Sequence, residues 1–452
     1  MIEKKKNIVI AGAGLVGSMW ACYLAKRGHN VQVFERRDDM RKYNMDAGRS
    51  INLALSTRGW RALEKIGLKE TLEKIAIPMH GRMIHQEDGT KDFQPYGKQG
   101  QSIYSISRGD LNIALMNKAD ENENISFSFN EKTTHLDLKR NTIHFKHTKT
   151  DSQSSLSPDL IFGADGAFSA VRGAMQKTNM FNYSQQYLEH GYKELTIPPT
   201  SDGEHRMDKN ALHIWPRKSF MLIALPNLDG SFTVTLFLQF KGDESFESLN
   251  NNDTILKFFK KYFPSALEHM PNVIQDFHDN PASSLVTVRC NPWHYENVCL
   301  LGDSAHAIVP FYGQGMNAGF EDCFVLDEII DRHQLGSWKD VFEEYTRDHV
   351  KNGHAIATLA LRNFIEMRDS TSSHRFLKRK QLERHLMNQF PDKYLSQYQM
   401  VTFSTIPYDT ALKRGDLQTN FAESLLDDYP DSASWSDPKF LEKVEKWLSL
   451  AH

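Results

Sequence analysis

Cysteine is scarce in this chain of 452 residues, and long apolar runs are absent. The four cysteines (Cys22, Cys290, Cys299 and Cys323) have no CxxC spacing, which argues against a zinc ribbon or a disulfide framework and favours a reduced, cytoplasmic protein. No window approaches the ~18 apolar residues of a membrane-spanning helix, and the polar N-terminus MIEKKKNIVI has no signal region. The sequence therefore predicts a soluble chain without a membrane anchor.

An excess of one charge is also missing. The 54 basic and 57 acidic residues leave a net charge of -3, so the chain has no basic signature of a nucleic-acid partner. The 19 histidines form no HExxH array, so we expect no protein-bound metal. A hydrophobic share of 40% and a charged share of 25% are typical of a globular enzyme, and the length predicts ~2 to 3 domains.

The N-terminal segment has the pattern of a dinucleotide-binding βαβ unit. A β-branched strand is followed by Gly12, Gly14 and Gly17 at G-x-G-x-x-G spacing, and a helix follows. Such glycines permit a tight turn, approach of backbone amides to a pyrophosphate, and close packing of helix on strand. A second strand ends in Glu35, which is placed to accept a hydrogen bond from a ribose hydroxyl. These features predict nucleotide binding.

Later motifs narrow the nucleotide to a flavin. Gly302-Asp303 ends a strand, where a carboxylate can accept from the hydroxyls of a ribityl chain. The segment PFYGQGMN (310–317) then precedes a helix, whose N-terminus would stabilise negative charge on a reduced flavin. In the turn GADG, Asp165 either caps the next helix or supports the cofactor, and the sequence leaves both open. We expect His306 to be a hydrogen-bonded structural histidine without a catalytic role.

The patterns alternate along the chain in a way that predicts two interleaved domains. Strand and helix alternate over 1–75 and 101–178 and again over 290–330, which predicts one discontinuous α/β nucleotide-binding domain. Strand-rich stretches predict a sheet-based substrate domain over 76–100 and 179–289. Helical patterns dominate 331–452. Near the end, Phe440, Val444, Leu448 and Leu450 form an apolar stripe that favours a packed helix over a membrane-surface helix.

Three motifs, GAGLVG (12–17), GADG (163–166) and GDSAHAIVPFYGQG (302–315), occur in this order. They resemble those of the class A flavin-dependent aromatic hydroxylases, and the resemblance covers the whole chain. Strings such as GRSINLALS (48–56), HGYKELTIPP (190–199), PFYGQGMNAGFED (310–322) and YQMVTFS (398–404) are similar, more narrowly, to the kynurenine 3-monooxygenase family. The resemblance implies a Rossmann-like FAD domain of the GR2, p-hydroxybenzoate hydroxylase-like type. It also implies hydroxylation of L-kynurenine to 3-hydroxy-L-kynurenine with FAD, NADPH as cosubstrate and O2, through a flavin C4a-hydroperoxide.

The resemblance also implies the site residues. An amino-acid substrate would be held by Arg82, Tyr96, Asn363 and Tyr398, because a guanidinium can bind a carboxylate through two hydrogen bonds. Phe237 and Met367 would line its ring, although each such residue alone is more commonly a packing residue. The residues expected to contact FAD are Gly12, Gly14, Val16, Gly17, Glu35, Arg36, Ala54, Arg108, Asp165, Asp303, Pro310, Gly313, Gly315, Met316 and Asn317.

Two other functions remain open from the sequence. A flavin hydroxylase could act on another anionic aromatic, such as a salicylate-like ring, and the Arg82, Tyr96, Asn363 and Tyr398 set disfavours this by suggesting an amino-acid headgroup. A non-catalytic flavin-binding protein would keep the glycine motifs and lose the substrate residues, whereas this chain has both sets. Oxidation of NADPH stimulated by the substrate would separate these possibilities.

Overall fold

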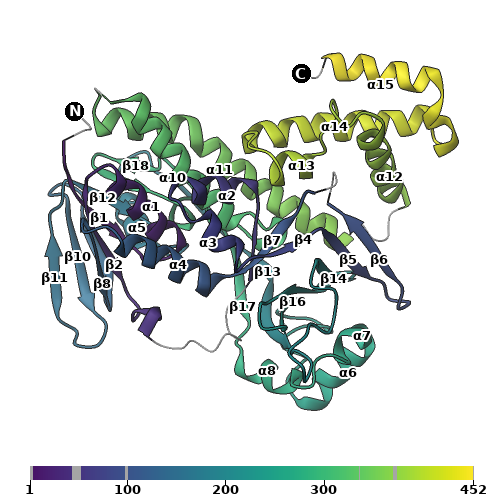
Figure 1. Cartoon of the computed structure of the whole chain (residues 1–452), viewed down its shortest axis with the longest axis horizontal. Coiled ribbons are helices and arrows are strands. Elements are labelled where there is room, and N and C mark those ends of the chain that lie inside the picture. Colours follow the sequence, from purple (N-terminus) through teal and green to yellow (C-terminus); the bar gives the residue numbers. More distant parts are fainter. Residues whose placement is uncertain (1–3, 43–51, 97–99, 335, 370–373, 451–452) are drawn as a thin grey trace.

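A six-stranded sheet carries the three nucleotide motifs (Figure 1). Here and below, the computed structural model describes residues 4–42, 52–96, 100–334, 336–369 and 374–450. Neighbouring strands are parallel except at the β18–β19 edge. The carboxyl ends of β1, β12 and β19 therefore meet at one edge, where all three motifs begin. The sheet order is β18 (His294–Tyr295), β19 (Val298–Leu300), β12 (Leu160–Gly163), β1 (Asn7–Ala11), β2 (Asn30–Glu35) and β8 (Ile125–Phe129).

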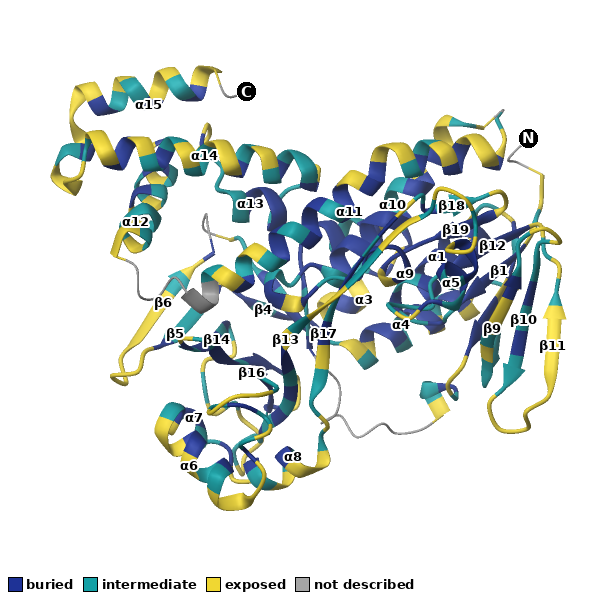
Figure 2. Cartoon of the chain, turned by 180° about the vertical axis from the view of Figure 1, so that it is seen from behind, coloured by how far each residue is buried: buried dark blue, intermediate teal, exposed yellow. Residues whose placement is uncertain are grey.

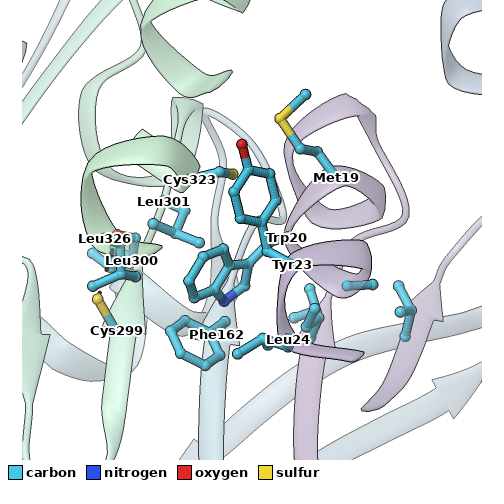
Figure 3. Packing of buried hydrophobic residues seen from close by; sticks show 14 of the residues in the cluster. Met19, Trp20, Tyr23, Leu24, Phe162, Cys299, Leu300, Leu301, Cys323 and Leu326 are labelled. Atoms are coloured by element: carbon cyan, nitrogen blue, oxygen red, sulfur yellow. Dashed lines mark hydrogen bonds between the residues drawn. The ribbon is translucent and has the colours of Figure 1, made fainter. Parts of the chain in front are cut away.

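Helices pack on this sheet and bury its apolar strands. In Figure 3, the Trp20 ring lies between the sheet and the helices, with its centroid 5.4 Å from that of Phe162 in an edge-to-face contact. Tyr23, Leu301 and Cys323 surround it. Burial of each such large apolar side chain contributes ~1.5 to 3 kcal/mol. The helices of this core are α1 (Leu15–Lys26), α4 (Arg108–Asp120), α10 (Gly315–Arg332) and α11 (Trp338–Asp369).

A seven-stranded sheet forms the second large layer. All neighbouring strands are antiparallel except β14 and β5, which are parallel. Residues 227–230 form the turn of a hairpin between β15 and β16. The sheet order is β17 (Ser283–Asn291), β13 (Asn182–Ile197), β16 (Phe232–Gln239), β15 (Phe220–Pro226), β14 (Ala211–Arg217), β5 (Gly81–His85) and β6 (Lys91–Pro95). An apolar core joins this sheet to α6 (Asn252–Tyr262), α7 (Pro264–Leu267) and α8 (Val273–Asp279).

Two three-stranded sheets complete the strands of the described residues. One has the order β3 (Asn52–Leu55), β7 (Ile103–Ser107) and β4 (Ile77–Met79), and the other has β11 (Gln153–Leu156), β10 (Thr142–His147) and β9 (Glu131–Asp137). The Asn52 amide on β3 donates 2.9 Å to the carbonyl of Pro226 at the end of β15. The first small sheet therefore joins the two large layers. Short helices also occur between strands, namely α2 (Thr57–Lys65), α3 (Lys69–Glu73) and α5 (Ala170–Met175), and α9 (Asp303–His306) follows the last strand.

The C-terminal region is helical, as predicted, and has a core of its own. Phe440, Val444 and Leu448 are buried there, but Leu450 is 77% exposed, so its inclusion in the packed stripe was wrong. Figure 2 shows that the C-terminal helices carry both buried and exposed residues. Leu450 occupies the last described turn, beyond the residues that the other helices cover. Among the described residues, no helix has the length and apolarity needed to cross a membrane. The helices are α12 (His374–Gln389), α13 (Gln397–Thr402), α14 (Tyr408–Asp428) and α15 (Pro438–Leu450).

The strands of the two large sheets come from the segments that were predicted for the two interleaved domains. The six-stranded sheet uses residues from 7–35, 125–163 and 294–300, and the seven-stranded sheet uses 81–95 and 182–291. The division into domains stays a prediction. The side chain of Met367 lies outside the described part of the structure, so its predicted contact with the substrate ring stays a prediction.

Candidate flavin and substrate site

The turn between β1 and α1 brings backbone close to backbone. Gly12 has φ +102°, and a Cβ there would lie 2.5 Å from the carbonyl oxygen of Ala164 in the GADG turn. A Cβ at Gly17 would lie 1.9 Å from the Gly12 carbonyl oxygen. Both positions therefore require glycine, for conformation and for space. Val16, between them, packs against Gly302 and Gly319, so two of the motifs touch through one side chain.

Glu35 stands at the end of β2, as predicted, and supports the glycine turn. Its carboxylate accepts from the amide of Ala13 at 3.0 Å and from the amide of Arg37 at 3.1 Å. Burial opposes its charge, but the Arg37 guanidinium, 2.8 Å away, holds the pKa of Glu35 below its ordinary value. The ionised carboxylate fixes the turn. Arg36 is exposed beside it, and contacts of either residue with a ribose stay predictions.

Asp303 lies at the carboxyl edge of the six-stranded sheet. Its side chain is exposed, yet the protein around it desolvates the carboxyl and raises its pKa, while the charge of Arg108 acts in the opposite direction. Arg108 begins α4, is exposed, and also lowers the pKa of Glu194, whose pKa burial raises. The predicted FAD contacts Asp303 and Arg108 thus carry opposite charges that act on each other.

A buried network holds the Gly302-Asp303 turn. The amide of Gly302 donates 2.7 Å to Asp322 Oδ2, and the same oxygen lies 2.6 Å from His306 Nε2. Asp322 Oδ1 lies 3.0 Å from His349 Nε2 on α11. Burial opposes the charge of Asp322, but both histidines hold its pKa far below the ordinary range. His306 is a buried, hydrogen-bonded histidine, as expected, and Asp322 is a residue that the sequence analysis missed.

Asn317 connects the segment 310–317, which we call the flavin loop, to β3. Its side-chain amide donates 2.8 Å to the carbonyl of Ala54 and 2.9 Å to that of Gly313, and its Oδ1 accepts from the amide of Ser56 at 2.9 Å. The structure therefore brings the predicted residues Ala54, Gly313 and Asn317 together. Because these bonds use both donors of the side chain, a cofactor contact of Asn317 would come from its backbone.

The rest of the predicted loop lies beside these residues. Pro310 starts a short 3₁₀ helix, and its carbonyl accepts from the amide of Gly313 at 2.8 Å. Gly315 begins α10, and Met316 is buried in the core of the six-stranded layer. The amino-terminal turn of an 18-residue helix thus directly follows the loop, and its backbone N–H groups can stabilise negative charge there.

Asp165 caps α5 and keeps one oxygen without a partner. Its Oδ2 accepts from the amides of Ala170 at 2.7 Å and Val171 at 3.3 Å, so the capping alternative is correct. Its Oδ1 is buried and has no hydrogen-bond partner among the described residues. A buried acceptor without a hydrogen-bond partner lowers stability, and a hydrogen bond from a bound group would remove this cost.

These features fit FAD. The glycine turn admits a pyrophosphate, Arg108 offers charge to it, and the carboxylates of Asp303 and Asp165 offer acceptors to hydroxyl groups. A separate hollow of ≈ 370 Å³ is lined by Asn7, Asn30 and other residues at the amino ends of β1 and β2. Because the motifs cluster at the carboxyl ends of the strands, we place the site there.

The predicted substrate residues from β5, β6 and α13 lie together. The Arg82 guanidinium carbon lies 4.8 Å from the Tyr398 ring centroid and 5.5 Å from that of Tyr96. The two phenol rings stack at 5.6 Å. Among the described residues no carboxylate pairs with Arg82, and its Nε and the Tyr96 hydroxyl are buried without hydrogen-bond partners. Burial raises the pKa of Tyr96 well above 10.0, so this phenol stays protonated at neutral pH.

Tyr312 links this cluster to the flavin loop. Its ring stacks on Tyr398 at 5.7 Å, directly before Gly313 in the chain, and burial raises its pKa well above 10.0. Asn363 on α11 donates 2.6 Å to the carbonyl of Phe311, so it holds the same loop. Phe237 is buried and packs on Phe311 at 4.9 Å. An apolar wall therefore adjoins the Arg82 cluster, and the substrate contacts of Asn363 and Phe237 stay predictions.

Comparison with known proteins gives the family. The family model described as an FAD binding domain matches residues 5–360. The kynurenine 3-monooxygenase of Flavobacterium johnsoniae is 48% identical over 448 residues, which is 99% of this chain and 100% of that protein. The kynurenine 3-monooxygenase of Dictyostelium discoideum is 45% identical over 94% of each chain.

Solved structures agree on the fold. The 2-methyl-3-hydroxypyridine-5-carboxylic acid oxygenase has a TM-score of 0.65 and 18% identity, over 81% of this chain and 93% of the other. PqsL of Pseudomonas aeruginosa has a TM-score of 0.60 and 18% identity, over 80% and 99%. The predicted α/β flavin-hydroxylase fold and the FAD cofactor are thereby confirmed. From the matches along almost its whole length, the chain belongs to the kynurenine 3-monooxygenase family of FAD-dependent enzymes.

Proposed function

We propose that this enzyme hydroxylates L-kynurenine to 3-hydroxy-L-kynurenine, with NADPH as reductant and O2 as the source of the oxygen atom. One observation carries the proposal. Arg82 is a guanidinium without a carboxylate partner, set between the phenols Tyr96 and Tyr398 in a largely buried place. A lone cation in such surroundings is costly, and a substrate carboxylate would compensate it.

The position of this cation agrees with a ring placed at the flavin. The Arg82 cluster continues through Tyr398 and Tyr312 to the Gly313 loop. A substrate whose carboxylate binds Arg82 would therefore direct its other end along Tyr312, toward the apolar wall of Phe311 and Phe237. An amino acid with an aromatic side chain has this distribution, with charge at one end and an apolar ring at the other.

The protein's own part in the reaction is to bind, orient and exclude water. FAD, when bound, supplies the redox chemistry, which carries electrons from NADPH to O2 and so activates O2. Arg82 holds the carboxylate, and the protonated phenols of Tyr96 and Tyr312 offer hydrogen bonds without charge. The buried aromatic residues keep bulk water from the reacting ring. No side chain is required as a general base for oxygen transfer to an electron-rich aniline.

The test uses the purified holoenzyme with and without L-kynurenine. We expect L-kynurenine to stimulate NADPH oxidation and to perturb the flavin absorption spectrum on binding. Salicylate is the matched control, because it has a carboxylate and an aromatic ring but lacks an amino-acid headgroup. Equal stimulation by both compounds would favour the broader hydroxylase, and spectral binding without NADPH oxidation would favour a flavin-binding protein without turnover.

A further inference from the structure

We propose that Arg58 is a positioning residue for the substrate site. Its guanidinium caps the carboxyl end of α13 and so fixes Tyr398 against Arg82. This inference deepens the proposed function and rests on it, because Tyr398 matters here as a substrate-binding residue. Arg58 lies on α2, directly after the strand that carries Ala54, and its side chain has no exposed surface.

The contacts of Arg58 converge on the end of α13. Its Nε donates 3.0 Å to the carbonyl of Val401, and its Nη2 donates 3.3 Å to that of Met400. Both carbonyls belong to the last turn of a helix, where no intrahelical amide is available to them. The same Nη2 donates to the carbonyl of Ile406, in the segment that follows the helix. Arg58 therefore caps two carbonyls of the last turn of α13, and the Ser404 hydroxyl adds a second donor to the carbonyl of Met400.

Tyr398 depends on the placement of this short helix. It occupies the first turn, and Ser396 caps that end through a reciprocal pair of bonds with Gln399. The amino end is thus satisfied within the helix itself, whereas the carboxyl end relies on Arg58, some 340 positions away in sequence. Six residues cannot form a stable helix alone, so external contacts hold α13 in place.

Arg58 also connects this helix to the flavin loop. Its Nη1 donates 2.6 Å to Glu321 on α10, and its guanidinium carbon lies 4.0 Å from the ring centroid of Tyr408. The Tyr408 hydroxyl donates 3.0 Å to Gln314, the residue that precedes α10 in the flavin loop. Support for the flavin loop and for Tyr398 thus passes through one guanidinium.

The chemistry of this contact requires arginine. Four acceptors lie around one guanidinium, and that guanidinium lies over an aromatic ring. A planar guanidinium with five N–H groups meets all of these at once, but the ammonium of lysine does not. Arg58→Lys therefore keeps the charge beside Glu321 and loses the cap.

The experiment compares Arg58→Lys with Arg61→Lys in the FAD-bound enzyme. Arg61 lies on the same helix and its guanidinium is 3.4 Å from Glu321, but within the part of the chain that the structure describes it has no hydrogen bond to α13. We expect Arg58→Lys to weaken L-kynurenine binding about ten-fold, as for loss of a charge-assisted bond, and to speed amide exchange over 398–403. FAD affinity should remain within about three-fold of the starting enzyme, and Arg61→Lys should change neither substrate binding nor exchange.

A double-mutant cycle with Tyr398→Phe separates positioning from general destabilisation. If Arg58 acts through Tyr398, Arg58→Lys costs much less affinity in the Tyr398→Phe background than alone. Full additivity, or unchanged exchange over 398–403, would overturn the inference. Should Arg58→Lys fail to fold, Glu321→Gln replaces it. A few-fold loss of affinity with faster exchange is then expected, and no change would count against the inference. If the unaltered enzyme fails to bind L-kynurenine, the proposed function falls, and the exchange data still decide whether Arg58 caps α13.

Discussion

Arg82 combines a permanent charge with aromatic surroundings, and its replacement tests the proposed carboxylate contact. Arg82→Met keeps the length and apolar stem of the side chain and removes the charge. We expect L-kynurenine affinity to fall by ~1.5 to 3 kcal/mol, which is about 10- to 150-fold, with FAD content unchanged. The L-kynurenine affinity of Arg82→Lys should lie between those of the unaltered enzyme and Arg82→Met, because a single ammonium cannot make a bidentate bond. Equal affinity of all three proteins would refute the contact.

Asp322 holds two histidines and the Gly302 turn from one buried carboxylate. Asp322→Asn removes the charge and leaves His306 without its ionic partner, so we expect a loss of ~3 to 5 kcal/mol in the free energy of unfolding. FAD retention should fall with it. The control is Asp331→Asn on the same helix, where the ion pair with Arg27 is half-exposed and a loss under ~1 kcal/mol is expected. Denaturant titration measures both; similar losses would show that the network is not special.

Residues in motifs could be predicted from the sequence, whereas residues that act through distant backbone could not. Gly12, Glu35 and Asp303 lie at or just after the carboxyl ends of strands, where their type and position suggest a role. Arg58 has no such signal, because its partners are carbonyls of residues 400, 401 and 406, and any residue type supplies a carbonyl. Asp322 stands six residues after Met316, close to a recognised motif, but its histidine partners come from two other helices.

At the scale of elements, β5 and β14 carry a buried histidine pair. His85 Nε2 lies 2.9 Å from His213 Nδ1, and the His85 ring stacks on Trp215 at 4.0 Å. Burial, with a contribution from His213, lowers the pKa of His85 to about 3 from 6.5. The neutral form is therefore the one that the folded protein accommodates.

This pair predicts loss of stability in acid. Because the folded pKa lies below the unfolded value, the unfolded state binds more protons between these values, and stability falls as pH drops from 6.5 toward 3. We expect Tm to decline over this range and the decline to be shallower in His85→Phe, which preserves ring stacking on Trp215. Substitution of the exposed His135 by Gln serves as the control. Parallel pH profiles for all three proteins would contradict the assignment.

Prediction of elements succeeded where one pattern sufficed. The strand-turn-helix pattern predicted β1, α1 and β2. The helix predicted at the segment 310–317 begins at Gly315. The small sheet of β9, β10 and β11 was not anticipated, because its strands are short and rich in polar residues. The exposed Leu450 shows the limit of periodicity, which predicts a face of a helix but not where covering neighbours end.

At the scale of the whole molecule, segments far apart in sequence close around one cofactor. The glycine turn, the GADG turn, Asp303 and the loop before α10 converge at one edge of the sheet. FAD should therefore stabilise the fold as a whole, by ~2.7 kcal/mol at 100 times its Kd. Hydrogen exchange of the apo and FAD-bound proteins should show protection gained over 12–18 and 302–317, with little change over 438–450. Protection confined to the C-terminal helices would place the cofactor elsewhere.

The most direct measurement of the proposed function is the fate of labelled oxygen. The enzyme is given L-kynurenine, NADPH and ¹⁸O2, and the product is analysed by mass and by the position of its hydroxyl group. The account predicts 3-hydroxy-L-kynurenine with a single ¹⁸O atom on the ring carbon next to the amino group. Unlabelled product, a hydroxyl group at another position, or NADPH oxidation that yields only hydrogen peroxide would contradict it.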